Sequence, residues 1–105
     1  MKVCYQDDQL ERIVDQAVIY QCACPAQVVN ALRFLRDLHN YQQDCLNESD
    51  TDKLVHQCIA TDAESAYKLL EDCLGKVLKL EGWDEETLKM PENLVKRMVE
   101  NVNRQ

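Results

Sequence analysis

Apolar side chains recur at every third or fourth position along most of this chain, which is the spacing of one face of a helix. The first stripe predicts a helix from Asp8 to Gln21, with Asp7 or Asp8 capping its free N–H groups. The second stripe predicts a helix of about 22 residues that begins at Pro25, because proline suits the first helical position. The chain is therefore expected to open with two amphipathic helices.

The next apolar stretch is expected to form two helices rather than one. A short helix is predicted over Thr51–Ala60, and a longer helix from Ala63 to Glu81. The sequence Thr61-Asp62-Ala63-Glu64 separates them, because threonine followed three residues later by glutamate matches a capping box. Gly82 is expected to end the longer helix in the left-handed conformation.

The last part of the chain predicts one more helical segment, capped by Asp84 and divided by Pro91 into a single turn and a longer piece. The apolar face of the longer piece contains Leu94, Val95, Met98, Val99 and Val102. The fold class predicted from these patterns is all-α. Its architecture is expected to be an antiparallel bundle of four main helices plus one short helix, and residues 1–105 form a single helical domain.

The composition supports a helical fold and narrows the classes of partner. With only two glycines and two prolines among 105 residues, the chain has few of the turns that many short strands would need. A formal net charge of −7 argues against binding to nucleic acid or to an anionic membrane surface. No apolar run is long enough to span a bilayer and no export signal is recognisable, so we expect a cytoplasmic protein with reduced thiols.

The most unusual chemical feature is Cys22-Ala23-Cys24-Pro25, at the entrance to the second helix. Cys24 is expected at the N-cap position, where the free N–H groups and the helix dipole would lower a thiol pKa. The two thiols could form a strained, easily reduced disulfide, or supply two ligands to zinc or copper(I). A weaker interpretation is haem-iron ligation by the Cys24-Pro25 pair. The alternative without chemistry is that Cys22 is a small apolar plug and Cys24 an ordinary cap.

A metal site at these two cysteines would need further ligands, since zinc takes four. Cys58 or His56 are the candidates within the chain, and a second subunit is the other source. Cys45 is excluded, because it lies at the far end of a helix about 33 Å long. Cys45, Cys58 and Cys73 are expected to pack mainly as small apolar side chains. No cofactor is required by the sequence, with zinc or copper as the alternative.

No motif assembles a catalytic site. Glu-x-x-His, a glycine-rich phosphate loop and a Gly-x-Ser-x-Gly elbow are all missing from the sequence. His39 lies on the second apolar stripe and is expected at the edge of the core. His56 is expected to form a surface pair with Asp52.

A candidate partner-binding surface consists of Arg33, Phe34, Arg36 and Tyr41, because arginine and aromatic side chains are enriched in interface hot spots. The alternative is that they cover a second core seam. The function expected from the sequence is a helical interaction or regulatory module without catalytic activity of its own. It would associate with itself or dock another protein. The alternative function is a thiol-based redox or soft-metal-binding protein that uses the Cys22-Ala23-Cys24-Pro25 loop.

Overall fold

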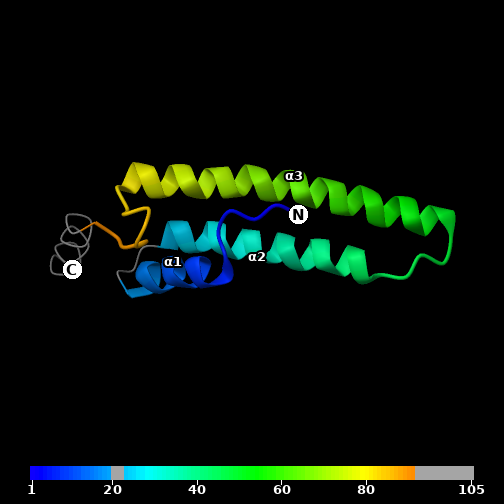
Figure 1. Cartoon of the computed structure of the whole chain (residues 1–105), viewed down its shortest axis with the longest axis horizontal. Helices are drawn as coiled ribbons and strands as arrows, with labels where there is room; N and C mark the ends of the chain where they lie inside the picture. Colours follow the sequence, from blue (N-terminus) through cyan, green and yellow to red (C-terminus); the bar gives the residue numbers. More distant parts are fainter. Residues whose placement is uncertain (20–22, 92–105) are drawn as a thin grey trace.

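The structure is a computed structural model that describes residues 1–19 and 23–91. These residues form three helices: α1 (Asp7–Ile19), α2 (Ala23–Asp44) and α3 (Asp50–Glu81). The part of the chain so described contains no strand. Helices α2 and α3 form a long antiparallel hairpin, and α1 lies beside the first half of α2 (Figure 1).

Helix α1 is held at its start by two hydrogen bonds of Gln6. The backbone N–H of Gln6 donates to the side-chain oxygen of Gln9 at 2.8 Å, and the N–H of Leu10 donates to the carbonyl of Gln6 at 3.0 Å. Gln6 therefore occupies the capping position, one residue before the acidic pair that the sequence suggested. The buried side of α1 consists of Leu10, Ile13 and Ala17.

Helix α2 begins at Ala23, two residues before the predicted start at Pro25. Pro25 lies in the first helical turn, where its missing N–H costs no helical hydrogen bond, and its side chain is buried. The helix ends at Asp44, close to the predicted end.

Helix α3 is continuous for 32 residues, so the predicted break at Thr61-Asp62-Ala63-Glu64 is wrong. The cap lies at Ser49, whose hydroxyl oxygen accepts a hydrogen bond from the N–H of Asp52 at 3.1 Å. At the expected break, the Ser65 hydroxyl donates to the Thr61 carbonyl at 3.3 Å. No glycine or proline interrupts this region, and Ala60 and Ala63 are both buried, so the core favours a continuing helix over a capping box.

The end of α3 confirms the predicted role of Gly82. This residue has φ 77° and ψ 27°, and its N–H donates to the Lys79 carbonyl at 3.1 Å. The N–H of Trp83 donates to the Leu78 carbonyl at 2.9 Å, which completes a Schellman motif. A side chain at Gly82 would be strained in this left-handed conformation.

Residues 84–88 form a capped turn rather than the start of another long helix. The Asp84 carboxylate accepts hydrogen bonds from the N–H groups of Thr87 and Glu86 at 2.8 and 2.9 Å, and these bonds lower its pKa. Leu88 then adopts a positive φ of 56°, which interrupts any helix. The predicted piece with Leu94, Val95, Met98, Val99 and Val102 lies outside the described residues.

The all-α class fits the structure, but the predicted four main helices plus one short helix do not. The described residues form three helices because the two segments expected at 51–60 and 63–81 are one helix, α3. The described chain measures 60 × 28 × 19 Å, and its smallest dimension is that of about two packed helices. Within residues 1–19 and 23–91, α1 is the one helix that packs against the hairpin.

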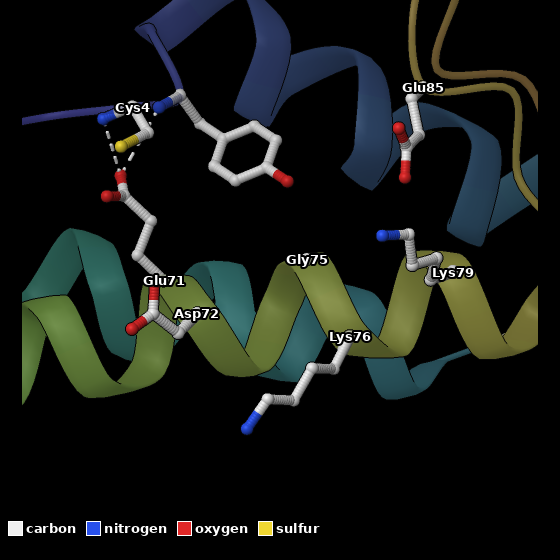
Figure 2. Close-up of a pocket in the computed structure, with 8 residues that line it drawn as sticks. Cys4, Glu71, Asp72, Gly75, Lys76, Lys79 and Glu85 are labelled. Atoms are coloured by element: carbon white, nitrogen blue, oxygen red, sulfur yellow. Dashed lines mark hydrogen bonds between the residues drawn. The ribbon is translucent and has the colours of Figure 1, made fainter.

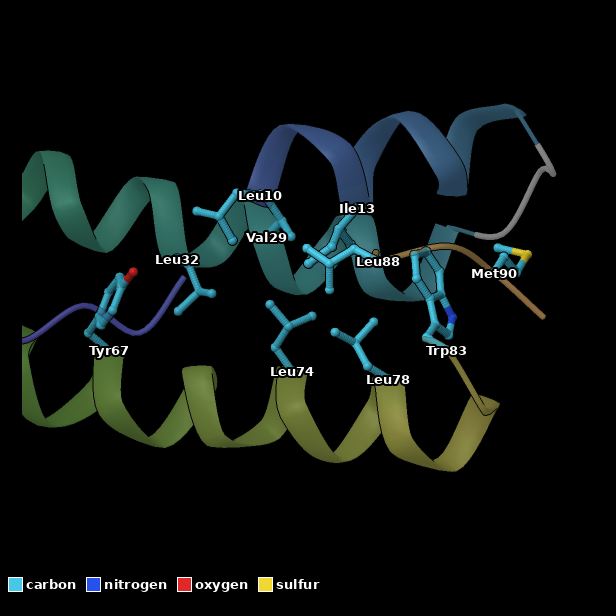
Figure 3. Packing of buried hydrophobic residues seen from close by; sticks show 10 residues of the cluster. All are labelled: Leu10, Ile13, Val29, Leu32, Tyr67, Leu74, Leu78, Trp83, Leu88 and Met90. Carbon is cyan, nitrogen blue, oxygen red and sulfur yellow. The ribbon is translucent and has the colours of Figure 1, made fainter. Parts of the chain in front are cut away.

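The core lies at one end of the hairpin, where α1 meets α2 and α3 (Figure 3). Trp83, Leu88 and Met90 of the segment after α3 close this end of the core, and the N–H of Met90 donates to the Gln16 side-chain oxygen at 3.1 Å. The buried apolar cluster contains Leu10, Ile13, Val29, Leu32, Tyr67, Leu74, Leu78, Trp83, Leu88 and Met90.

Within residues 1–19 and 23–91, no helix has the length and apolar character needed to cross a membrane.

Candidate functional site

One side of the α2/α3 hairpin is covered by α1 and by segment 1–6, which runs along the groove between the two long helices (Figure 1). Glu71 of α3 is buried and anchors this segment. It accepts hydrogen bonds from the backbone N–H groups of Cys4 at 2.8 Å and Tyr5 at 3.2 Å (Figure 2). Two backbone donors on one buried carboxylate form a strong, directional attachment.

Arg36 anchors the same segment from α2. Its guanidinium donates to the Tyr67 hydroxyl at 2.8 Å, to the Tyr5 carbonyl and to the Asp7 carboxylate. The guanidinium carbon also lies 5.4 Å from the centre of the Tyr67 ring, which adds a cation–π contact. Burial raises the pKa of Tyr67, while the Arg36 charge opposes that rise. Arg36 is therefore committed to internal contacts.

His39 completes the polar row on this side of the hairpin. Its side chain is buried, and Nε2 lies 2.8 Å from the Glu64 carboxylate of α3. The prediction that His39 lies at the edge of the core is confirmed, with a carboxylate as its polar partner. The covered side of the hairpin is thus held by hydrogen bonds and charge pairs from Arg36, His39, Glu64 and Glu71.

A cleft of about 620 Å³ lies beside segment 1–6 (Figure 2). The residues that line it include Cys4, Tyr5, Glu71, Lys76 and Lys79. A hydrogen bond from the Cys4 thiol to Glu71 and the negative charge of that carboxylate raise the thiol pKa. A raised pKa keeps the thiol protonated near neutral pH, and the protonated form is a poor nucleophile. The cleft therefore holds no activated cysteine.

The opposite side of the hairpin is different, and we call it the open face. It consists of half-buried apolar side chains at helical spacing. On both α2 and α3, the row of fully buried residues separates these side chains from the side that contacts segment 1–6. None of these side chains is charged. The open face contains Val28, Ala31, Leu35 and Leu38 of α2 and Ile59, Ala66, Leu70, Cys73 and Val77 of α3.

Further apolar side chains border the open face. On α2, Phe34 and Tyr41 lie two helical turns apart and are 68% and 67% exposed. On α3, Leu69 is 70% and Leu80 is 87% exposed. Large apolar side chains that gather on one surface, rather than occurring singly, are typical of interaction sites.

The four residues predicted to bind a partner do not stay together. Phe34 and Tyr41 are exposed beside the open face, as a docking surface requires. Arg33 instead forms an ion pair with Glu11 of α1 at 2.9 Å. Arg36 points to the opposite side of the hairpin, where it holds segment 1–6.

The predicted thiol site is described in part. Cys24 is exposed and lies in the first turn of α2 rather than at its N-cap, while Cys22 lies outside the described residues. Cys58 is also exposed, but it lies in the other half of the hairpin, roughly 30 Å from Cys24 along the helix axes. The structure therefore does not bring Cys58 to Cys24.

His56 is equally far from Cys24, and its Nδ1 lies 2.8 Å from the side-chain oxygen of Asn47 rather than beside Asp52. It lines a cleft of about 300 Å³ with Cys45 and Gln42. Within residues 1–19 and 23–91, no three His, Cys, Asp or Glu side chains are grouped so that they could hold a metal ion.

Comparison with known proteins gives no match, whether with protein-family models, with curated protein sequences or with solved structures.

The open face was missed in the sequence, although a signal for it is present. The apolar stripe of α2 includes Val28, Ala31, Leu35 and Leu38 beside the fully buried Val29 and Leu32, and is therefore wider than one neighbouring helix needs. A wide stripe indicates contacts on two sides. Among the described residues, α3 is one neighbour of α2 and α1 is the other, on the side of Arg33, and no third helix packs against α2.

Proposed function

We propose that this protein is a helical interaction module of the cytoplasm that docks a protein through the open face and has no catalytic activity of its own. The observation that carries the proposal is the half-buried apolar surface on one side of the α2/α3 hairpin, against which no other described helix packs. The cytoplasmic part of the proposal is supported by the five cysteines in the described residues, all of which are free thiols.

The contrast in charge supports docking on this face. The chain has a net charge of −7, yet the nine side chains that define the open face are uncharged, and the exposed Asp62 of α3 lies beside them, three residues after Ile59 and four before Ala66. Depletion of charge together with enrichment of aromatic side chains is typical of protein interfaces. Phe34 and Tyr41 supply the aromatic border.

The energetics also favour docking. Burying apolar surface stabilises a complex by about 25 cal/mol per Å² before the costs of association are counted. Both helices are already formed in the unbound chain, so docking carries no cost of folding them. A rigid, preformed helical surface is therefore suited to bind another helix.

The proposal is tested by capturing the tagged full-length chain from cells with three versions of the protein. Ala66→Glu places a charge in the open face, whereas Leu54→Glu places one at a position of α3 that is 66% exposed outside it. We expect the wild type and Leu54→Glu to retain the same protein, identified by mass spectrometry as another copy or another chain, and Ala66→Glu to lose it. Identical retained proteins for all three versions would contradict the proposal.

The exposed Cys24 favours a second candidate function, thiol redox or soft-metal chemistry at the entrance of α2. Free backbone N–H groups in a first helical turn stabilise a thiolate. The test is the pH dependence of Cys24 alkylation together with the metal content of the native protein. A midpoint well below the usual thiol pKa of ~8.5, or bound zinc or copper, would support this function. An ordinary midpoint without metal would remove it.

A further inference from the structure

We propose that the partner on the open face is a second copy of this chain, and that two α2/α3 hairpins pair through it as a four-helix bundle. This inference rests on the proposed function, because it names the occupant of the same surface. In each copy, α1 and segment 1–6 would remain on the outer sides of the bundle. The pairing would give the isologous contact of a two-fold dimer, in which the same surface serves both subunits.

Charge is the first argument for a second copy. A net charge of −7 on each of two chains opposes their association, and this cost is smallest when the contact surface itself carries no charge. The open face meets this condition, since its side chains on both helices are uncharged. A basic partner would be recognised by an acidic cluster around the surface, whereas the open face is bordered by Phe34 and Tyr41 on α2 and by a single carboxylate, Asp62, beside Ile59 and Ala66 on α3.

The size of the surface is the second argument. Between Ile59 and Val77, α3 contributes a length of about 27 Å at the usual rise per residue. Two neighbouring helices are about 20 Å wide in total, so the face covers roughly 500 Å² on each copy. The footprint for a pair is roughly 1,000 Å², at the low end for a specific interface, and the exposed side chains of Phe34, Tyr41 and Leu69 add to the area that a pair can bury.

The mixture of side-chain sizes is the third argument. The small side chains Ala31, Ala66 and Cys73 alternate along the face with larger leucine, isoleucine and valine side chains. Small positions on one helix can accept large side chains of a facing helix, which is the packing of helical bundles. A surface that contains both kinds of position can therefore complement itself.

The test is sedimentation equilibrium of the full-length protein over a range of concentrations, with wild type, Ala66→Glu and Leu54→Glu. We expect a reversible dimer for the wild type and for Leu54→Glu, and a dissociation constant at least ~100-fold higher for Ala66→Glu, because the charge would be buried without a partner. Leu38→Glu, on the other helix of the open face, should repeat the loss if Ala66→Glu fails to fold.

Two results would overturn the second copy as occupant. A wild type that remains monomeric, but captures a different protein that Ala66→Glu loses, would contradict the dimer while leaving the proposed function intact. A monomer that becomes a dimer only when Val95 and Met98 are both replaced by aspartate would assign the open face to the chain's own C-terminal residues. Failure of the capture experiment as well would overturn the proposed function itself.

Discussion

The two sides of the α2/α3 hairpin differ in chemistry although they belong to the same two helices. On the covered side, Arg36 and Glu71 attach segment 1–6 through its backbone, and the His39–Glu64 pair joins α2 to α3. The side chains that define the open face are uncharged, and each is valine, leucine, isoleucine, alanine or cysteine. Within the described residues, no terminal segment is attached to this face. The hydrogen bonds of Arg36 and Glu71 fix the position of segment 1–6 on the covered side. The proposed partner would bind the apolar side.

This difference shows that the ionic groups near the hairpin serve the fold. Arginine and aromatic residues on α2 look alike in the sequence, but Arg36 contacts Tyr5 and Tyr67 while Phe34 faces solvent. A hydrogen-bonded guanidinium positions a backbone segment, and an exposed phenyl ring can support association. Mutations on the two sides should therefore affect different quantities.

The largest effect on stability is expected from Arg36→Ala. It removes three hydrogen bonds and a cation–π contact, and it leaves the Tyr5 carbonyl and the Tyr67 hydroxyl without their donor, at a cost of about 3 kcal/mol in the free energy of unfolding. Urea denaturation measures this cost. The matched control is Arg33→Ala, whose partly exposed ion pair with Glu11 should contribute less than about 0.5 kcal/mol. Equal losses for the two arginines would contradict the role assigned to Arg36.

Glu71→Ala should have the next largest effect. The two backbone N–H groups of Cys4 and Tyr5 would lose their acceptor, which costs about 2 kcal/mol. Glu71→Gln keeps one acceptor oxygen and should lose less. Thermal or urea denaturation gives the difference, and protection of the amides of Cys4 and Tyr5 from hydrogen exchange shows whether segment 1–6 has detached. Unchanged protection in Glu71→Ala would contradict the anchoring.

A smaller effect, about 1 kcal/mol, is expected from Ser49→Ala, because it removes the N-cap of α3. Thr61→Ala is the control, since the sequence alone assigned a cap to that threonine. In a continuous α3, Thr61→Ala should change the free energy of unfolding by less than about 0.5 kcal/mol. A loss at Thr61 as large as that at Ser49 would restore the predicted break.

The smallest effect concerns the pH dependence of Cys4. Because Glu71 raises the thiol pKa, the folded protein holds the Cys4 proton more tightly than the unfolded chain does. The stabilisation is present below the ordinary thiol pKa and is lost as pH rises through the raised one. Alkylation of Cys4, followed by mass spectrometry, should have a midpoint that falls in Glu71→Gln. The same midpoint in the wild type and in Glu71→Gln would show that Glu71 does not raise the pKa of the Cys4 thiol.

The helical class, the two ends of α2 to within about two residues and the Gly82 stop could be predicted, because periodicity and glycine geometry are local properties. The break at Thr61 could not be judged locally. A capping-box sequence also fits inside a helix when buried residues on both sides, such as Ala60 and Tyr67, continue the same face. Burial of these residues in the core favours a continuous helix over a break at Thr61.

The candidate site was harder to predict than the helices. Phe34 and Tyr41 could be recognised as exposed because they lie off the buried row of α2. Arg36 was misjudged as a surface residue, since its partners Tyr5 and Tyr67 are distant in sequence. The open face depends on where segment 1–6 and α1 pack, and no local pattern specifies on which side of a hairpin a terminal segment lies.

The most direct test of the open face as the contact between two copies uses two cysteines of the unmodified protein. Cys73 lies half-buried in the open face, whereas Cys58 is exposed on α3 outside it. We predict that the alkylation rate of Cys73 falls at least ~10-fold as protein concentration rises through the dimer dissociation constant, because a second copy covers the thiol. The rate at Cys58 should stay constant. A Cys73 rate independent of concentration in a sample shown to be dimeric would place the contact elsewhere and contradict the account.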